Sequence, residues 1–220
     1  MTESLAERAY VGIKEEVLSC ALPPGSLINE ATLADQFGTS KTPVRQAIGK
    51  LAGEGFVDVF PRRGSLVRAV QVRDIKHVFL IRSLVEPEAS ALAARNATPS
   101  DIARLEELDD HQLSSGTDML DLAAHAKFHV SVVQIARVPQ LTSIITSLQD
   151  QMRWFLAAQV ADGGPMPPKA NHHRLVTAIR THDAEEARAI TEESIRMSRE
   201  QLLHRIIHSA DTPDQAAVGA

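Results

Sequence analysis

The stretch that decides the fold runs from residue 33 to residue 47 and reads LADQFGTSKTPVRQA. A short helix is predicted over residues 30–37, and Gly38 ends it because glycine adopts the left-handed conformation of a helix C-terminus at little cost. The next helix follows within a few residues, with Pro43 in its first turn, and continues to about residue 53. Two short helices with so tight a connection predict a helix-turn-helix.

The segments on either side complete a winged helix. Residues 5–20 carry apolar side chains mostly at helical spacing, so they predict a first helix, which a Leu-Pro-Pro-Gly run ends. After Gly55 the pattern alternates, and residues 56–60 and 65–68 predict two strands. The turn between them, at residues 61–64, carries two arginines at its tip. Three helices followed by a basic hairpin predict a winged helix-turn-helix.

The rest of the chain is predicted to be helical, with breaks at Pro, Gly or short polar runs. The helical patterns cover residues 72–95, 99–114, 117–135, 139–160, 169–181 and 183–208. We therefore expect a mainly α protein in which a winged helix-turn-helix over residues 1–70 precedes an all-helical bundle over residues 71–208. Residues 209–220 are polar and rich in alanine, and they predict a disordered tail.

The charge is distributed unevenly along the chain. The formal net charge is −5, which by itself argues against a nucleic-acid partner. Residues 41–68, however, contain six Lys or Arg against two Asp or Glu, whereas residues 71–220 contain 15 against 20. A basic segment attached to an acidic one indicates that only the first part contacts phosphate.

The compartment is predicted from what the sequence lacks. Cys20 is the single cysteine, so no intramolecular disulfide can form. No apolar run reaches the roughly 18 residues of a membrane span, and the N-terminus has no signal-peptide core. We expect a cytoplasmic protein without a membrane partner.

The residues predicted to contact double-stranded DNA lie in the second helix of the helix-turn-helix and in the turn of the hairpin. A recognition helix enters the major groove with its first turn, where Arg45 can form a bidentate contact with guanine. The cations of the hairpin turn suit phosphate or the minor groove. The predicted contacts are Ser40, Lys41, Thr42, Arg45, Arg62, Arg63 and Gly64.

Residues 10–68 resemble the DNA-binding domain of the GntR family of bacterial regulators. The resemblance rests on four motifs, at residues 22–27, 33–38, 42–47 and 51–57, followed by the Arg-Arg-Gly hairpin turn. Lys41 stands where the family usually has arginine, so its contact keeps the charge but loses the planar fork.

Residues 72–208 resemble the helical FCD domain of the FadR subfamily, in its shorter, six-helix form. The motifs that carry this resemblance lie at residues 81–86, 125–129, 171–179 and 183–187. The resemblance implies a transcription regulator whose helical domain binds a small organic acid. We also expect a two-fold homodimer, joined mainly through the helical domain, because two recognition helices related by one axis read a palindromic operator.

The same resemblance implies a metal site. Many members of the subfamily hold a divalent ion with one Asp and three His; here the matching positions are His125, His129, His172 and Ser194. His125 and His129 are four residues apart and share one face of a helix, and an all-imidazole set favours zinc or nickel over manganese, with zinc the expected ion. The alternative is that these are ordinary surface or core histidines.

Arg82 is the natural partner for the carboxylate of an acidic effector, since arginine binds carboxylates in bidentate fashion. The alternative for Arg82 is an ion pair with Glu86, one helical turn further on. Arg153 and Ser194 are further candidates for the effector site.

Two other functions compete with an acid-controlled regulator. The helical domain could serve only to dimerise an effector-independent DNA-binding protein, because two of the usual metal positions have changed. A metal-dependent enzyme would also use three histidines around an ion. The sequence has no HExxH motif, nucleophile elbow, phosphate loop or suitably spaced carboxylate pair, so we do not expect an enzyme.

Overall fold

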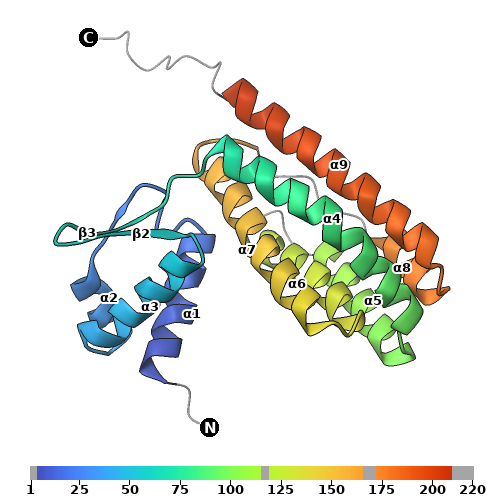
Figure 1. Ribbon diagram of the computed structural model, residues 1–220, viewed down its shortest axis with the longest axis horizontal. Coiled ribbons are helices and arrows are strands. Elements are labelled where there is room, and N and C mark those ends of the chain that lie inside the picture. Colours follow the sequence, from blue (N-terminus) through green and yellow to red (C-terminus); the bar gives the residue numbers. More distant parts are fainter. Residues whose placement is uncertain (1–3, 115–118, 166–171, 210–220) are drawn as a thin grey trace.

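The computed structural model describes residues 4–114, 119–165 and 172–209, and it shows a small winged helix beside a larger bundle of helices (Figure 1). The winged helix comprises α1 (Leu5–Leu18), β1 (Leu27–Ile28), α2 (Glu30–Gln36), α3 (Lys41–Gly53), β2 (Val57–Phe60) and β3 (Gly64–Val67). The bundle comprises α4 (Val72–Asn96), α5 (Pro99–Ser114), α6 (Met119–Ile135), α7 (Pro139–Ala161), α8 (His173–Arg180) and α9 (Ala184–Ser209). The predicted fold class is confirmed.

The helix-turn-helix forms as its sequence predicts. Asn29 caps α2, because its side-chain oxygen accepts hydrogen bonds from the backbone N–H groups of Ala31 and Thr32 at 3.0 and 3.2 Å. Gly38 follows α2 with φ of +61°, the left-handed conformation that allows the chain to turn into α3. α1 lies between α3 and α7 (Figure 1).

The sheet has one strand that the sequence did not predict. Its order is β1-β3-β2 and both pairings are antiparallel, with Val57 opposite Val67 and Leu27 opposite Leu66. β1 spans only two residues, which is too short for an alternating pattern to be recognised.

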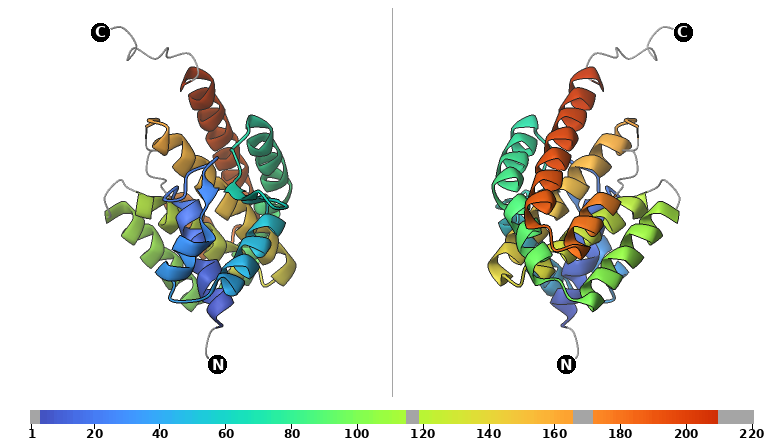
Figure 2. Two further views of the ribbon diagram at one scale, coloured as in Figure 1. Left: turned by 90° about the vertical axis from the view of Figure 1, so that its left-hand side faces the viewer. Right: turned by 90° about the vertical axis from the view of Figure 1, so that its right-hand side faces the viewer.

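The helical part packs around two of its longest helices. α4 and α9 lie along one another on the outside of the bundle (Figures 1 and 2). Apolar side chains from α4, α5, α6, α8 and α9 form a core among these five helices, which includes Leu105, Phe128, Leu175 and Ile179. Tight packing of this kind fixes α6 and α8 relative to each other, which matters for the site described below.

The winged helix and the bundle share a second core. Side chains of α1 and α3 belong to one buried cluster with Met152, Trp154 and Phe155 of α7. The ring of Phe56 meets that of Trp154 edge to face, with centroids 5.4 Å apart. The predicted domain boundary near residue 70 falls between β3 and α4, and it stays a prediction because this core crosses it.

Three predicted segments lie partly outside the described residues. The helix predicted from residue 117 is described from Met119 onward, and the helix predicted from residue 169 is described from His173 onward. The predicted tail is not described beyond Ser209, where α9 ends. Within the described ranges, no helix combines the length and apolar character that crossing a membrane requires.

Candidate DNA interface and metal centre

The predicted DNA contacts are all exposed. Ser40 is the N-cap position of α3, and Lys41, Thr42 and Arg45 project from its first turns. The remaining contacts lie in the hairpin turn, where Arg62 and Gly64 have positive φ values of +65° and +95°. Positive φ is uncommon for arginine, and it tightens the turn that presents the two cations to solvent.

Arg45 is held in place by an acidic neighbour. Its Nε lies 2.7 Å from Oε2 of Glu30, the first residue of α2, while the arginine side chain remains 66% exposed. The ion pair uses the Nε edge of the guanidinium. The glutamate therefore orients the side chain that the sequence assigns to the major groove.

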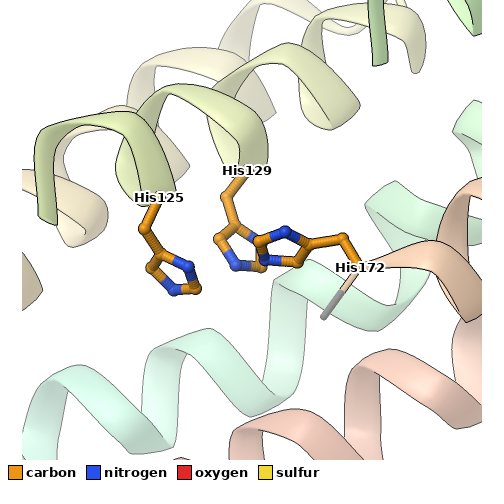
Figure 3. Close-up of side chains that lie close together, drawn as sticks. All are labelled: His125, His129 and His172. Carbon is orange, nitrogen blue, oxygen red and sulfur yellow. The ribbon is translucent and has the colours of Figure 1, made fainter. Parts of the chain in front are cut away.

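Three histidines meet inside the bundle. His125 and His129 lie one turn apart on α6, and His172 directly precedes α8 (Figure 3). The ring centroids are 4.6 Å apart for His125 and His129, and 5.1 Å apart from each of these to His172. One nitrogen from each ring can be chosen so that all three lie within 4.8 Å of one another. This is the set that the sequence proposed as metal ligands.

The surroundings of His172 suit a metal ion. The residue is 6% exposed, and within the described part of the chain neither ring nitrogen has a hydrogen-bond partner. Its Nδ1 lies 3.3 Å from Oδ1 of Asp109, without hydrogen-bond geometry, while the same oxygen accepts the backbone N–H of His172 at 3.2 Å. Buried polar atoms are nearly always satisfied, and a bound ion would satisfy this ring.

The protonation state of the three rings also fits metal binding. Burial lowers the pKa of His125 to about 3, assisted by the nearby charges of His172 and Arg82. Burial lowers the pKa of His172 to about 4, and it holds the pKa of His129 well below its usual value. Neutral imidazoles are the form that binds a metal, so no proton has to be removed near pH 7.

The fourth predicted position lies elsewhere. Ser194 is exposed on α9, and its place in the effector site stays a prediction. Thr191, one turn earlier and 5% exposed, faces inward and donates a hydrogen bond to Ser90 at 2.8 Å. Thr191 and Ser194 are three residues apart and lie about 60° apart around the axis of α9, with Thr191 buried and Ser194 exposed.

Arg82 has the ion pair that was the alternative to effector binding. Its Nε and Nη2 donate to the two carboxylate oxygens of Glu86 at 2.8 and 3.1 Å, and both side chains are 5% exposed. Gln149 of α7 also donates to Oε1 of Glu86, at 3.0 Å. The charge of the guanidinium nonetheless helps to lower the pKa of His125 and of His129.

Arg153 does not line this site. Its Nη1 lies 2.8 Å from Oε2 of Glu15 on α1, and Nη2 contacts the other carboxylate oxygen. The carboxylate on α1 holds the long side chain at the contact between α1 and α7, and the place of Arg153 in the effector site stays a prediction.

A small cavity lies next to His129. It is lined by Glu86, Ala89, Ser90, His129, Val132, Val133, Ile145 and Thr191. Its volume of about 10 Å³ corresponds to roughly one water molecule. An organic acid would therefore have to move side chains of this wall in order to bind.

Both parts of the chain match known families. Residues 5–67 match the family described as bacterial regulatory proteins, gntR family, and residues 77–197 match the FCD domain. The two matches follow one another with a short gap, in the same order as the winged helix and the bundle.

Individual relatives are transcription regulators. The chain is 26% identical over 216 residues to the HTH-type transcriptional repressor RspR of Escherichia coli (strain K12), which covers 91% of this chain and 92% of the repressor. It is 31% identical over 173 residues to a probable D-xylose utilization operon transcriptional repressor of Paenarthrobacter nicotinovorans, covering 77% and 76% of the two chains. Among solved structures, E. coli McbR/YncC aligns with a TM-score of 0.76 at 25% identity, over 93% of this chain and 100% of that one.

Proposed function

This chain belongs to the GntR family of bacterial regulatory proteins and carries an FCD domain, and we propose that a small organic acid controls its affinity for a palindromic operator. The family makes it a DNA-binding transcription regulator and not an enzyme. The observation that carries the proposal is the meeting of three neutral imidazoles beside a buried guanidinium in the helical domain.

His125, His129 and His172 would hold a divalent ion, most suitably zinc, which binds imidazole nitrogen readily. Asp109 supports the site from behind His172, because its carboxylate fixes the backbone at that residue. The ion would supply a concentrated positive charge that attracts the carboxylate of an acid. The chain's own contribution is to bring three uncharged imidazole rings together.

The acid is proposed to reach from this ion toward Arg82. A guanidinium binds a carboxylate through two parallel hydrogen bonds, so it would orient the acid as well as attract it. The nearby hydroxyls of Ser90 and Thr191 line the cavity and suit a hydroxyl or second polar group of the ligand.

A two-fold dimer is proposed to present the two recognition helices. The outer face of α4 carries Leu80, Ile81 and Leu84 with exposed fractions of 58%, 42% and 70%. These side chains are adjacent on the helix surface, and a row of exposed apolar residues favours a protein partner. A second copy packed there would place the helical domains at the dimer axis.

Metal analysis and calorimetry test this proposal. The purified protein, given excess zinc, should bind one ion per chain, and the double substitution of His125 and His129 by alanine should abolish that binding. The zinc-loaded protein should then bind at least one small carboxylic acid. Failure to bind zinc stoichiometrically would contradict the metal site.

The occupied fork of Arg82 and the small cavity favour one other function, an effector-independent DNA-binding dimer. That function predicts operator affinity that is the same with and without zinc and acids. It also predicts that acids leave the melting temperature of the zinc-loaded protein unchanged.

A further inference from the structure

A buried polar group connects α4 to α7 beside the histidines. Arg82 and Glu86 of α4 form a bidentate ion pair, and Gln149 of α7 donates to the same glutamate at 3.0 Å. Gln149 is 2% exposed, so the whole group is removed from water. Charged groups at such depth are stable only while they are paired.

The pair has the geometry that an acidic ligand would need. The Nε and Nη2 atoms of Arg82 already bind the two carboxylate oxygens of Glu86. That edge of the guanidinium is therefore not available to another carboxylate. Glu86 also forms part of the wall of the cavity that contains His129. An acid that entered this cavity would therefore meet the glutamate before it met the arginine.

We propose that Glu86 occupies the place of the effector carboxylate, and that an acid binds Arg82 by exchanging with it. This inference rests on the proposed function, in which the effector is an organic acid. The exchange replaces one carboxylate on the guanidinium with another, so Arg82 stays paired throughout. The released glutamate remains in a wall that also holds Ser90, whose hydroxyl accepts from Thr191 and keeps its own hydrogen to donate.

The exchange would change a hydrogen bond of α7. When Glu86 leaves Arg82, the side-chain amide of Gln149 either moves with the carboxylate that accepts its hydrogen bond or loses that bond. The next residue, Asp150, pairs with Lys14 of α1 at 2.8 Å, and Lys14 pairs at 2.8 Å with Glu54, which caps the end of the recognition helix α3. Ligand exchange at Arg82 thereby bears on the contact that positions the DNA-binding part.

The protein contains one tryptophan, and it reports on this contact. Trp154 lies on α7, is 3% exposed and meets the ring of Phe56. Its emission should change when α7 moves relative to the winged helix, so acid binding and its transmission can be followed separately.

The experiment titrates the full chain, with and without zinc, with acetate, malonate and citrate, using calorimetry and Trp154 emission together. Glu86→Gln removes the competing charge but keeps a hydrogen-bonding side chain, and it should bind at least one acid about tenfold more tightly than the wild type. The matched control is Glu88→Gln, on the same helix, where the glutamate is 50% exposed and pairs with Arg188 at the surface. Its acid affinity should equal that of the wild type.

If the wild type binds an acid and Glu86→Gln binds it with the same or lower affinity, the exchange is overturned. The proposal that the effector is an acid would still hold. Equal tightening in Glu88→Gln would overturn it as well, because the effect would then be general electrostatics. No acid binding by any of the proteins would overturn both the exchange and the proposed effector class.

Gln149→Met provides a second test that leaves the ion pair in place. It removes the amide that steadies Glu86, so acid affinity should rise about threefold. The change in Trp154 emission should fall to less than half of the wild-type change, since α7 no longer senses the glutamate. A full emission change in Gln149→Met would overturn the role of α7, and unchanged affinity would overturn the competition.

Discussion

Arg45 is the side chain that is proposed to read a base, and an ion pair limits its orientations. It projects from the start of α3, and Glu30 holds its Nε edge at 2.7 Å while most of the side chain faces solvent. A surface ion pair of this kind adds little stability, but it reduces the number of orientations that the guanidinium samples. The pair would therefore matter more for the proposed base contact than for folding.

Arg45→Ala should weaken operator binding by about 1–3 kcal/mol per half-site and relax the preference at one base pair. Arg63→Ala, in the hairpin turn, should weaken binding to all sequences more evenly because phosphate contacts carry no sequence information. Mobility shifts on a panel of single-base operator variants measure both effects. Arg73→Ala, whose side chain is 68% exposed outside the winged helix, is the control. A harmless Arg45→Ala would show that α3 is not the reading helix.

The three histidines make the stability of the metal-free protein depend on pH. Their folded-state pKa values lie below the usual 6.5, at about 3 for His125 and about 4 for His172. Below pH 6.5 these histidines bind protons in the unfolded chain but not in the folded chain, so the free energy of unfolding falls as the pH falls toward 4. The melting temperature of metal-free wild type should decrease more over this range than that of His125→Asn. Parallel curves for the two proteins would contradict the neutral cluster.

The elements of the bundle were predictable because Pro, Gly and polar runs separate their helical patterns. The sequence also predicted that His125 and His129 share a face, since spacing along one helix is sufficient for that. Contacts between distant elements were not predictable in this way. Asp109 reaches the backbone of His172 from α5, and Arg153 turns to Glu15 on α1, because both depend on how helices pack.

At the scale of the helices, the exposed face of α4 and the contact between α1 and α7 each lead to a testable prediction. Leu84 is 70% exposed on α4 and is the most exposed residue of the proposed dimer surface. Leu84→Asp should convert the dimer into a monomer in sedimentation velocity, because a charge would be buried in an apolar interface. Met197→Asp, on an exposed site of α9, should leave the dimer intact. A dimer that survives Leu84→Asp would place the interface elsewhere.

Lys14 joins α1 to α7 through Asp150 and to the end of α3 through Glu54. Burial lowers its pKa, but hydrogen bonds to the two carboxylates outweigh this and raise the pKa above its usual value. Lys14→Met would leave Asp150 and Glu54 without their shared cation, and it should reduce the free energy of unfolding by about 2 kcal/mol. Urea unfolding measures the loss. Lys50→Met, at a site 47% exposed, should cost much less, and equal losses would contradict the role of Lys14.

In the whole molecule, the winged helix and the bundle share a core, so a change in the bundle can alter how the reading helix is held. An allosteric effect of this kind requires that the acid bind two arrangements of the protein with different affinity. Gln149 joins the Arg82–Glu86 pair of α4 to α7, and Asp150 joins α7 to Lys14 of α1, so a change at the ion pair has a route to the winged helix.

The most direct test is operator affinity, measured by fluorescence anisotropy on a duplex that the protein itself selects from random sequence. The selected site should be palindromic, and the zinc-loaded wild type should change its affinity for it by at least about fivefold when a binding acid is added. The His125→Ala, His129→Ala double variant should bind the same duplex but show no response to the acid. A wild type that is indifferent to zinc and acids, or a double variant that responds equally, would contradict the account.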